Sequence, residues 1–306
     1  MTEQAKIYSE FNDLVALRFQ TQLRKLAHQQ KLLAASSGEH HAVRKGRGMT
    51  FSEVRQYQPG DEIRHIDWKV TARTQKAHTK VFIEERERPT LIITEQTPSL
   101  FFGAKVRLKT SQALNIAATL AWVSLQQNER VGGLVFGAET QSGLHPKRSK
   151  HSVLRYLQAG INMQQQLQRP ARASASRWHD ALQATQELIR PGSKVYLIGD
   201  MTLLAQHSID KVKQLARHND LVAIHIFDEI EQHLPELGWL MMADSLESTP
   251  IRFDSSRRET QMAYQQIYQQ QWQNAQMAFR SLHIPLVAID NQQDPIQQLL
   301  QQGVLR

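Results

Sequence analysis

The sequence predicts an α/β protein built on a doubly wound, mostly parallel sheet, and three observations carry this prediction. From residue 89 onward, short apolar runs alternate with longer amphipathic segments, as strands and helices alternate in a parallel sheet. The first run, Leu91–Thr94, has the apolar character of a strand that is buried on both faces. A tight turn after the second run predicts a hairpin, and therefore one antiparallel edge strand.

Five apolar segments are predicted to form the sheet. They lie at residues 91–94, 131–136, 194–200, 221–227 and 285–289. We expect the first three to be adjacent, parallel and buried. Gly137–Glu139 predicts the tight turn, and the antiparallel strand that follows it ends at His145 and Pro146.

The segments between the strands have helical periodicity. So does the segment 8–34, which precedes them: its apolar residues recur at spacings of three and four, with Arg and Lys between. The segment 106–127 has an alanine-rich face, which permits close packing on a sheet. The predicted helices span residues 8–34, 106–127, 149–168, 177–190, 203–218, 256–282 and 294–302. Between 230 and 255, Pro and Gly punctuate short predicted strands.

The composition is that of a globular protein. The chain has 306 residues, of which 41% are hydrophobic and 22% charged, and no apolar run reaches the roughly 18 residues that span a bilayer. There is no Cys, which excludes disulfides and thiolate metal sites. The N-terminus carries early acids and no apolar signal segment. We therefore expect a cytoplasmic protein without a transmembrane segment. The net charge of +8 favours acidic partners.

A charged stretch runs from Phe51 to Arg88 and precedes the first predicted sheet strand. It has a turn at residues 57–61, aromatic residues among paired opposite charges, and an expected strand at 80–85. We expect its aromatic residues to anchor it on a larger body, with Trp68 largely buried against the sheet domain. We also expect Arg55, Arg64 and Arg73 to engage carboxylates such as Asp61 or Asp67. The predicted organisation is an N-terminal helix (1–37), the charged segment packed on the core (38–88), and an α/β domain (89–306).

Polar residues follow two of the predicted strands. Glu95, Thr97 and Ser99 come after the first strand, and Asp200 ends the strand 194–200. Ligands of open α/β sheets bind beyond the carboxyl ends of the strands, and oxygen ligands of this kind suit Mg²⁺. The spacing is equally compatible with a simple hydrogen-bonded turn.

The charged stretch resembles the signature of the family called domain of unknown function 58. The matching segments are Arg55–Asp61, Arg64–Lys69, Ala72–Thr74 and Glu85–Arg88, in that order. The resemblance covers about residues 45 to 245. The signature residues, which we take as the interaction set, are Arg55, Tyr57, Pro59, Gly60, Asp61, Arg64, Asp67, Trp68, Lys69 and Arg73.

That family is similar to von Willebrand factor A domains, which implies a von Willebrand A-like sheet and a metal-ion-dependent adhesion site. The first loop of such a site reads Asp-x-Ser-x-Ser, whereas this chain has Glu95-x-Thr97-x-Ser99, with Asp200 in place of the later Asp. Thr140 and Thr185 are poor matches for the third-loop Thr. The extra methylene of Glu disfavours octahedral Mg²⁺, so we expect a degenerate site that binds Mg²⁺ weakly and keeps its shape through hydrogen bonds.

The resemblance implies a non-enzymatic adaptor that works beside a MoxR-type AAA+ ATPase in assembling or maturing another protein complex. The client protein is not implied. Two alternatives stay open: a basic nucleic-acid-binding module, and a metal-dependent hydrolase that uses Asp67, Glu95 and Asp200. Opposite charges interleave in the signature stretch, whereas strong nucleic-acid binders usually present one-sign patches, so nucleic acid is the less favoured partner.

Overall fold

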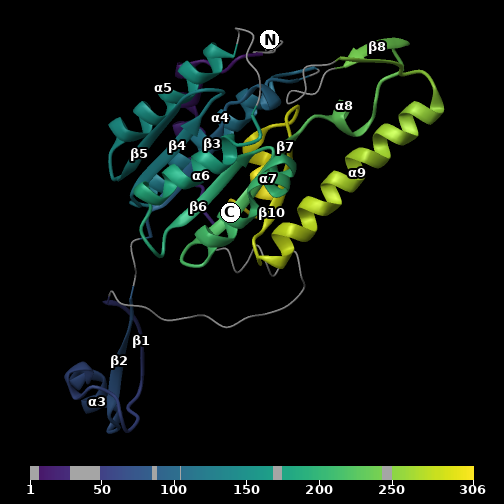
Figure 1. Ribbon diagram of the computed structural model, residues 1–306. Coiled ribbons are helices and arrows are strands. Elements are labelled where there is room, and N and C mark those ends of the chain that lie inside the picture. The colour runs from purple at the N-terminus through teal and green to yellow at the C-terminus, as the bar shows by residue number, and fades with distance from the viewer. Residues whose placement is uncertain (1–6, 28–48, 85–87, 104, 168–173, 243–249) are drawn as a thin grey trace. The chain divides into compact units, whose positions relative to one another are not determined.

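The computed structural model describes residues 7–27, 49–84, 88–103, 105–167, 174–242 and 250–306. The chain divides into two compact units (Figure 1). We call residues 1–39 and 88–306 the sheet unit, and residues 40–87 the ribbon unit. The N-terminal helix therefore belongs with the sheet, whereas the sequence led us to expect a separate segment.

The sheet unit is built on a six-stranded sheet in the order β10-β7-β6-β3-β4-β5 (Figure 1). Its strands are β3 (Thr90–Glu95), β4 (Val131–Phe136), β5 (Gln141–Lys147), β6 (Lys194–Gly199), β7 (Asp220–Phe227) and β10 (Leu286–Asp290). Strand β3 pairs in parallel with both β4 and β6, which confirms the three adjacent parallel strands. Strand β5 pairs antiparallel with β4 and forms the predicted edge.

Alternate residues of the central strands face two separate apolar layers, because successive side chains of a strand point to opposite sides. Ile92 belongs to one layer, with helices α1, α4, α5 and α10. Leu91 and Ile93 belong to the other, with α6, α7 and α9. The helices are α1 (Phe11–Gln20), α4 (Lys109–Gln126), α5 (Lys150–Gln166), α6 (Arg177–Leu188), α7 (Met201–Ala216), α9 (Arg258–Ser281) and α10 (Pro295–Gln301). The sheet is covered on both faces, as predicted.

The N-terminal helix is shorter than predicted. We expected it to span residues 8–34, but α1 ends at Gln20. Beyond it the chain pairs with the C-terminus, since Leu26 forms an isolated bridge with Leu305, and Lys25 and Arg306 each donate an N–H to the other's carbonyl. The backbone groups that would continue the helix are thus used in a long-range pairing. Residues 28–34 lie outside the described part of the chain.

The segment between β7 and α9 carries the predicted short elements. Helix α8 (Glu229–Gln232) follows β7 and begins with a capping box on Asp228. Strands β8 (Trp239–Met242) and β9 (Ile251–Asp254) form an antiparallel pair. Among the helices of the described residues, none combines the length and apolar character that a bilayer crossing requires.

The ribbon unit is an antiparallel pair with two short helices. Strand β1 (Met49–Gln56), which the sequence did not reveal, pairs with β2 (His78–Glu84). The 3-10 helix η1 (Ile63–His65) and helix α3 (Trp68–Thr74) lie between them in the chain. Within the ribbon unit Trp68 is not buried, since 69% of this residue is exposed, so the unit itself does not supply the burial that we expected.

Candidate functional site

The predicted strand-end residues come together at the carboxyl edge of the sheet. Strands β3 and β6 are parallel neighbours, so their carboxyl ends lie side by side. Glu95 ends β3, and Asp200 follows β6 at once. The backbone N–H of Asp200 donates to Oε2 of Glu95 at 2.8 Å. A Cβ on Gly199 would overlap that same oxygen, so glycine leaves the space that the carboxylate fills.

The Glu95 carboxylate is buried and fully engaged by its neighbours. It is 1% exposed. The hydroxyls of Thr97 and Ser99 donate to Oε1 at 2.6 and 3.0 Å. The indole N–H of Trp178 donates to Oε2 at 3.1 Å, beside the N–H of Asp200. Burial raises the pKa of Glu95, and the charge of Asp200 raises it further, against the opposing effect of the Thr97, Asp200 and Ser99 hydrogen bonds.

Asp200 acts as the N-cap of helix α7. Its Oδ1 accepts the backbone N–H groups of Thr202 and Leu203 at 2.9 and 3.3 Å, and the hydroxyl of Thr202 at 2.6 Å. These bonds satisfy N–H groups that the first turn of a helix leaves free. Burial alone would raise the pKa of Asp200, but Lys109, His225 and these hydrogen bonds together hold it below its ordinary value.

Lys109 is the cation of this edge, and the sequence reasoning missed it. It is the first residue of α4, is 1% exposed, and donates from Nζ to Oε1 of Glu231 at 2.7 Å. Burial lowers the pKa of Lys109, but the charges of Glu231, Asp200 and Glu95 outweigh that effect and raise it. A lysine at a helix N-terminus faces the positive end of the helix dipole, so this ammonium depends on the three carboxylates. The long sequence separation from Glu231 left no local signal for the pair.

His225 completes the cluster from the neighbouring strand. It pairs in register with Gly199, and its Nδ1 accepts the backbone N–H of Met201 at 3.1 Å. The neutral ring therefore carries its proton on Nε2. The imidazole stacks on Trp272 of α9 with a centroid distance of 4.9 Å. Burial lowers the pKa of His225 and outweighs the attraction of Asp200.

The residues at this edge do not fit the metal ion that the resemblance implies. Both oxygens of Glu95 already accept hydrogen bonds from neighbouring groups, and the Thr97 and Ser99 hydroxyls lie 2.6 Å from each other. The positive charge of Lys109 interacts with both Glu95 and Asp200. It therefore supplies the positive charge that a divalent cation would otherwise supply to these two carboxylates. Within the described residues, no three His, Asp or Glu side chains are grouped to hold a metal ion. Of the two third-loop candidates, Thr185 is buried and donates to Ala181 O, and Thr140 is exposed.

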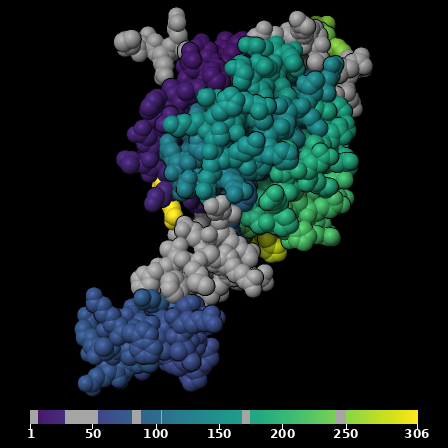
Figure 2. Space-filling model, turned by 90° about the vertical axis from the view of Figure 1, so that its left-hand side faces the viewer, coloured from purple at the N-terminus to yellow at the C-terminus, as the bar shows by residue number. Residues whose placement is uncertain are grey.

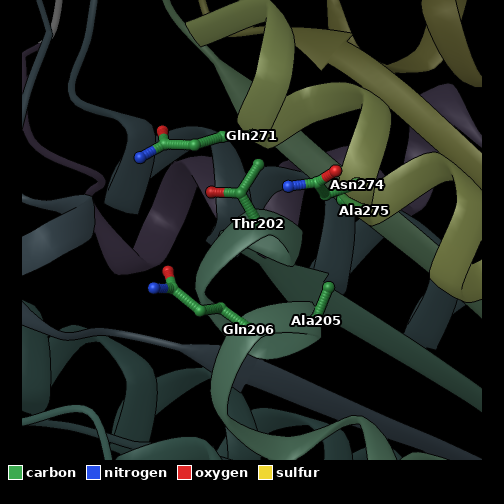
Figure 3. A pocket seen from close by; sticks show the side chains of 6 residues that line it. All are labelled: Thr202, Ala205, Gln206, Gln271, Asn274 and Ala275. Atoms are coloured by element: carbon green, nitrogen blue, oxygen red, sulfur yellow. The ribbon is translucent and has the colours of Figure 1, made fainter. Parts of the chain in front are cut away.

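A small depression lies beside Thr202, between α7 and α9 (Figure 3). Its volume is about 190 Å³. The side chains lining it are uncharged and mostly polar: Thr202, Ala205, Gln206, Gln271, Asn274 and Ala275. It places amide groups next to the cap of α7, but adds no acid, base or nucleophile to the edge.

The signature residues form contacts within the ribbon unit. Arg55 pairs with Asp61 through two hydrogen bonds of 2.6 and 2.8 Å, and Asp61 also accepts the N–H of Gln58 at 2.9 Å. Gly60 has φ +105°, which suits the turn. The predicted Arg55–Asp61 pair is therefore confirmed.

Two of the three predicted arginine contacts are not found among the residues that the structure describes. Asp67 caps α3 through the N–H groups of Lys69 and Val70, and its other oxygen lies 3.6 Å from Lys80 Nζ. Arg64 and Arg73 are exposed and form no ion pair with any residue that the structure describes. The carboxylates expected for them are used by Arg55 and Lys80 instead.

Comparison with known proteins identifies the family. The family described as "Protein of unknown function DUF58" matches residues 53–274. The chain belongs to this family. Uncharacterized proteins of Mycobacterium bovis and Mycobacterium tuberculosis are each 27% identical to it over 231 residues, which are 74% of this chain and 70% of theirs.

The solved structures found by comparison are more distant from this DUF58 chain. The conserved hypothetical protein BatB from Bacteroides thetaiotaomicron has 13% identity and a TM-score of 0.45, over 70% of this chain and 95% of BatB. An aerotolerance-related membrane protein from Bacteroides fragilis has 12% identity and a TM-score of 0.41, over 71% and 98%. An uncharacterized membrane spanning protein from Vibrio fischeri has 10% identity and a TM-score of 0.21, over 71% and 96%.

These neighbours correct one expectation for the DUF58 chain. The sequence led us to expect a cytoplasmic protein. Two of the three solved neighbours are described as membrane proteins. The expectation of a cytoplasmic location is therefore contradicted, and we withdraw it.

Proposed function

We propose that this DUF58 chain is a non-enzymatic, von Willebrand A-like interaction protein that assists a MoxR-type AAA+ ATPase in assembling or maturing a client protein complex. The observation that carries the proposal is the internal engagement of the carboxyl edge. Glu95 is buried among four donors, Asp200 caps α7, and Lys109 is paired with Glu231. A catalytic acid or base must reach a substrate, whereas these groups bind one another.

The loop that follows β3 is held in one shape by the same contacts. Leu100 is completely buried, and the 3-10 helix η2 (Pro98–Leu100) begins directly after Thr97. The carbonyl of Phe102 accepts the N–H of Lys109 at 2.7 Å. The Phe102 side chain is nevertheless 40% exposed. A rigid loop that presents an aromatic side chain is suited to docking, because little conformational entropy is lost on binding.

An exposed ion pair lies at the same edge. Lys105 donates to Glu229 of α8 at 3.0 Å, and both side chains are exposed. Together with Phe102 it gives the edge an apolar anchor and a polar rim, the usual composition of a protein interface. The MoxR-type ATPase as partner rests on the family resemblance.

The test is capture of the ATPase from native cells with the full chain as bait and the ATPase trapped in its ATP state. We expect the natural chain to retain the ATPase, and the double variant Phe102→Ala, Lys105→Glu to lose it. The matched control is Leu23→Ala. Leu23 is 92% exposed and lies two residues after Thr21, whose hydroxyl accepts from Gln126 at the C-terminal end of α4, whereas Phe102 contacts the N-terminal end of that helix.

Three outcomes would contradict the proposal. The first is a natural chain that retains no MoxR-type ATPase. The second is retardation of DNA by the purified chain at physiological salt, which supports a nucleic-acid-binding module. The third is turnover of a substrate that a chelator abolishes, which supports a metal-dependent hydrolase.

A further inference from the structure

The ribbon unit presents, on two consecutive short helices, exposed apolar side chains and cations that form no ion pair with any residue the structure describes. We infer that this surface binds an acidic segment of the client protein that carries an apolar anchor. We use the name cationic face for the exposed residues of η1 and α3 on which the inference rests, namely Ile63, Arg64, Trp68, Lys69 and Arg73. The inference rests on the proposed adaptor function and deepens it, because it names the chemistry of the client segment.

Helix α3 sorts its side chains onto two faces. Val70 and Thr71 are half-buried, and the hydroxyl of Thr71 accepts the N–H of His78 at the start of β2. Trp68 and Lys69 are exposed, and so is Arg73, one turn after Lys69. The outward face of α3 therefore combines an aromatic ring with a pair of cations.

The apolar part of the cationic face is large for so small a unit. Trp68 is 69% exposed and Ile63 67%. Among the ribbon-unit side chains that the structure describes, only Thr79 is buried. A two-stranded ribbon without a core is marginally stable alone, so covering these two side chains would stabilise the unit. Trp is also among the residues that most often dominate binding energy at interfaces.

The charge of the cationic face is not balanced locally. Asp61 is used by Arg55, Asp67 by Lys80 and the N-cap of α3, and Glu62 lies 3.5 Å from His65. Arg64, Lys69 and Arg73 form no ion pair with any described residue. Among the described residues, no carboxylate competes with a partner's carboxylates for these three cations.

An acidic segment of a separate protein fits this face better than the chain's own sheet unit or a nucleic acid does. Residues 40–87 contain ten Lys and Arg against seven Asp and Glu, which leaves +5 of the net charge of +8 on the rest of the chain. The sheet unit is thus itself basic and a poor electrostatic match. Phosphate backbones favour continuous one-sign surfaces, whereas Asp61, Glu62 and Asp67 alternate with these cations along the sequence.

The test measures binding of fluorescein-labelled probes to the full chain by anisotropy. The probes are a peptide with leucines spaced among glutamates, the same peptide with serines in place of the leucines, single-stranded DNA, and phosphatidylserine vesicles. The charge variant is Lys69→Gln with Arg73→Gln. Its control is Lys213→Gln with Arg217→Gln, which removes two exposed cations, also four residues apart, from the end of α7.

We expect the leucine peptide to bind more tightly than the serine peptide, and more weakly as salt rises. The charge variant should weaken binding roughly two- to thirtyfold, and the control pair should leave it unchanged. Trp68→Ala should weaken it by at least about tenfold. The matched aromatic control is Trp239→Ala, since Trp239 is 60% exposed in the sheet unit. Unfolding of Trp68→Ala should match that of the natural chain, since the ring is exposed.

The inference is overturned if the leucine peptide does not bind, or if the control variants weaken binding as much as the cationic-face variants. It is also overturned if DNA or vesicles bind through Trp68 and Lys69 more tightly than the peptide does. The double variant Phe102→Ala, Lys105→Glu should bind the peptide normally. If the natural chain fails to capture the ATPase but binds the peptide, the ATPase partnership is refuted and the binding role of the cationic face is not.

Discussion

At the scale of single residues, Lys109 holds the carboxyl edge together by electrostatic attraction. Its ammonium group is buried, and its direct partner, Glu231, is only partly buried. Replacing Lys109 by Met keeps the stem volume but removes the charge-assisted bond. We expect the free energy of unfolding to fall by about 1.5–3 kcal/mol, measured by urea denaturation.

The control for Lys109 is the exposed pair nearby. Lys105→Met removes the ion pair with Glu229, and surface pairs contribute little, so its stability should hardly change. If the free energy of unfolding falls equally in the two variants, the burial of Lys109 does not make its ion pair more stabilising than the exposed pair.

Glu95 and Lys109 together determine how weakly this edge binds Mg²⁺. We expect the natural chain to bind Mg²⁺ no tighter than about millimolar. In Glu95→Asp the shorter side chain withdraws from Trp178 and from the Asp200 N–H, but Lys109 still opposes a cation. The double variant Glu95→Asp, Lys109→Met should bind Mg²⁺ at least about tenfold more tightly, or roughly 1.4 kcal/mol. Calorimetry that finds micromolar Mg²⁺ binding by the natural chain would contradict this account.

His225 makes stability depend on pH in a defined direction. Its pKa is lowered in the folded chain, so below about 6.5 the unfolded chain binds a proton that the folded chain refuses. Stability from this residue is therefore complete above pH 6.5 and is lost as pH falls toward the folded pKa. The charges acting on the ring are those of Asp200, Lys109 and Glu231.

The variant His225→Asn separates this dependence from that of the other histidines. The amide oxygen of Asn can still accept the Met201 N–H. Unfolding measured between pH 7 and pH 5 should show a shallower decline for the variant than for the natural chain. If the stability of both chains declines with the same slope between pH 7 and pH 5, His225 is not the source of the pH dependence.

At the scale of elements, the N-terminus of α7 explains Asp200 without a metal. Its carboxylate caps the helix, so Asp200→Ala should destabilise the chain by about 0.5–2 kcal/mol. Asp200→Asn keeps the capping oxygen and should cost much less in thermal denaturation. If both substitutions destabilise equally, the charge and not the cap is what the site requires.

The sequence predicted the sheet well because its signals are local. The apolar runs at Leu91, Val131 and Val195 are adjacent parallel strands, and Glu95 and Asp200 meet at their ends. The predicted length of the N-terminal helix was wrong because Leu26 pairs with Leu305, which is distant in the sequence.

Two further features escaped prediction because they depend on the three-dimensional arrangement. Strand β1 depends on pairing with β2, and its own sequence carries no strong apolar run. Lys109 looked like an ordinary charged residue at the start of a helix, and only the fold brings Glu231 to it. A signal was nevertheless present in Glu229 and Glu231, two acids placed directly after a strand.

At the scale of the whole molecule, the chain consists of a large sheet unit and a small ribbon unit (Figure 2). Among the described side chains of the ribbon unit, only Thr79 is buried. The two units offer different surfaces: a rigid carboxyl edge with Phe102, and the cationic face around Trp68. A protein that joins an ATPase to a client needs two such surfaces.

The most direct test is calorimetric titration of the purified full chain into a hydrolysis-deficient MoxR-type ATPase loaded with ATP. We predict saturable binding by the natural chain and by Trp68→Ala, and loss of binding in the double variant Phe102→Ala, Lys105→Glu. Binding that needs Trp68 but not Phe102 would contradict the assignment of the two surfaces. No heat of binding from the natural chain would contradict the partnership itself.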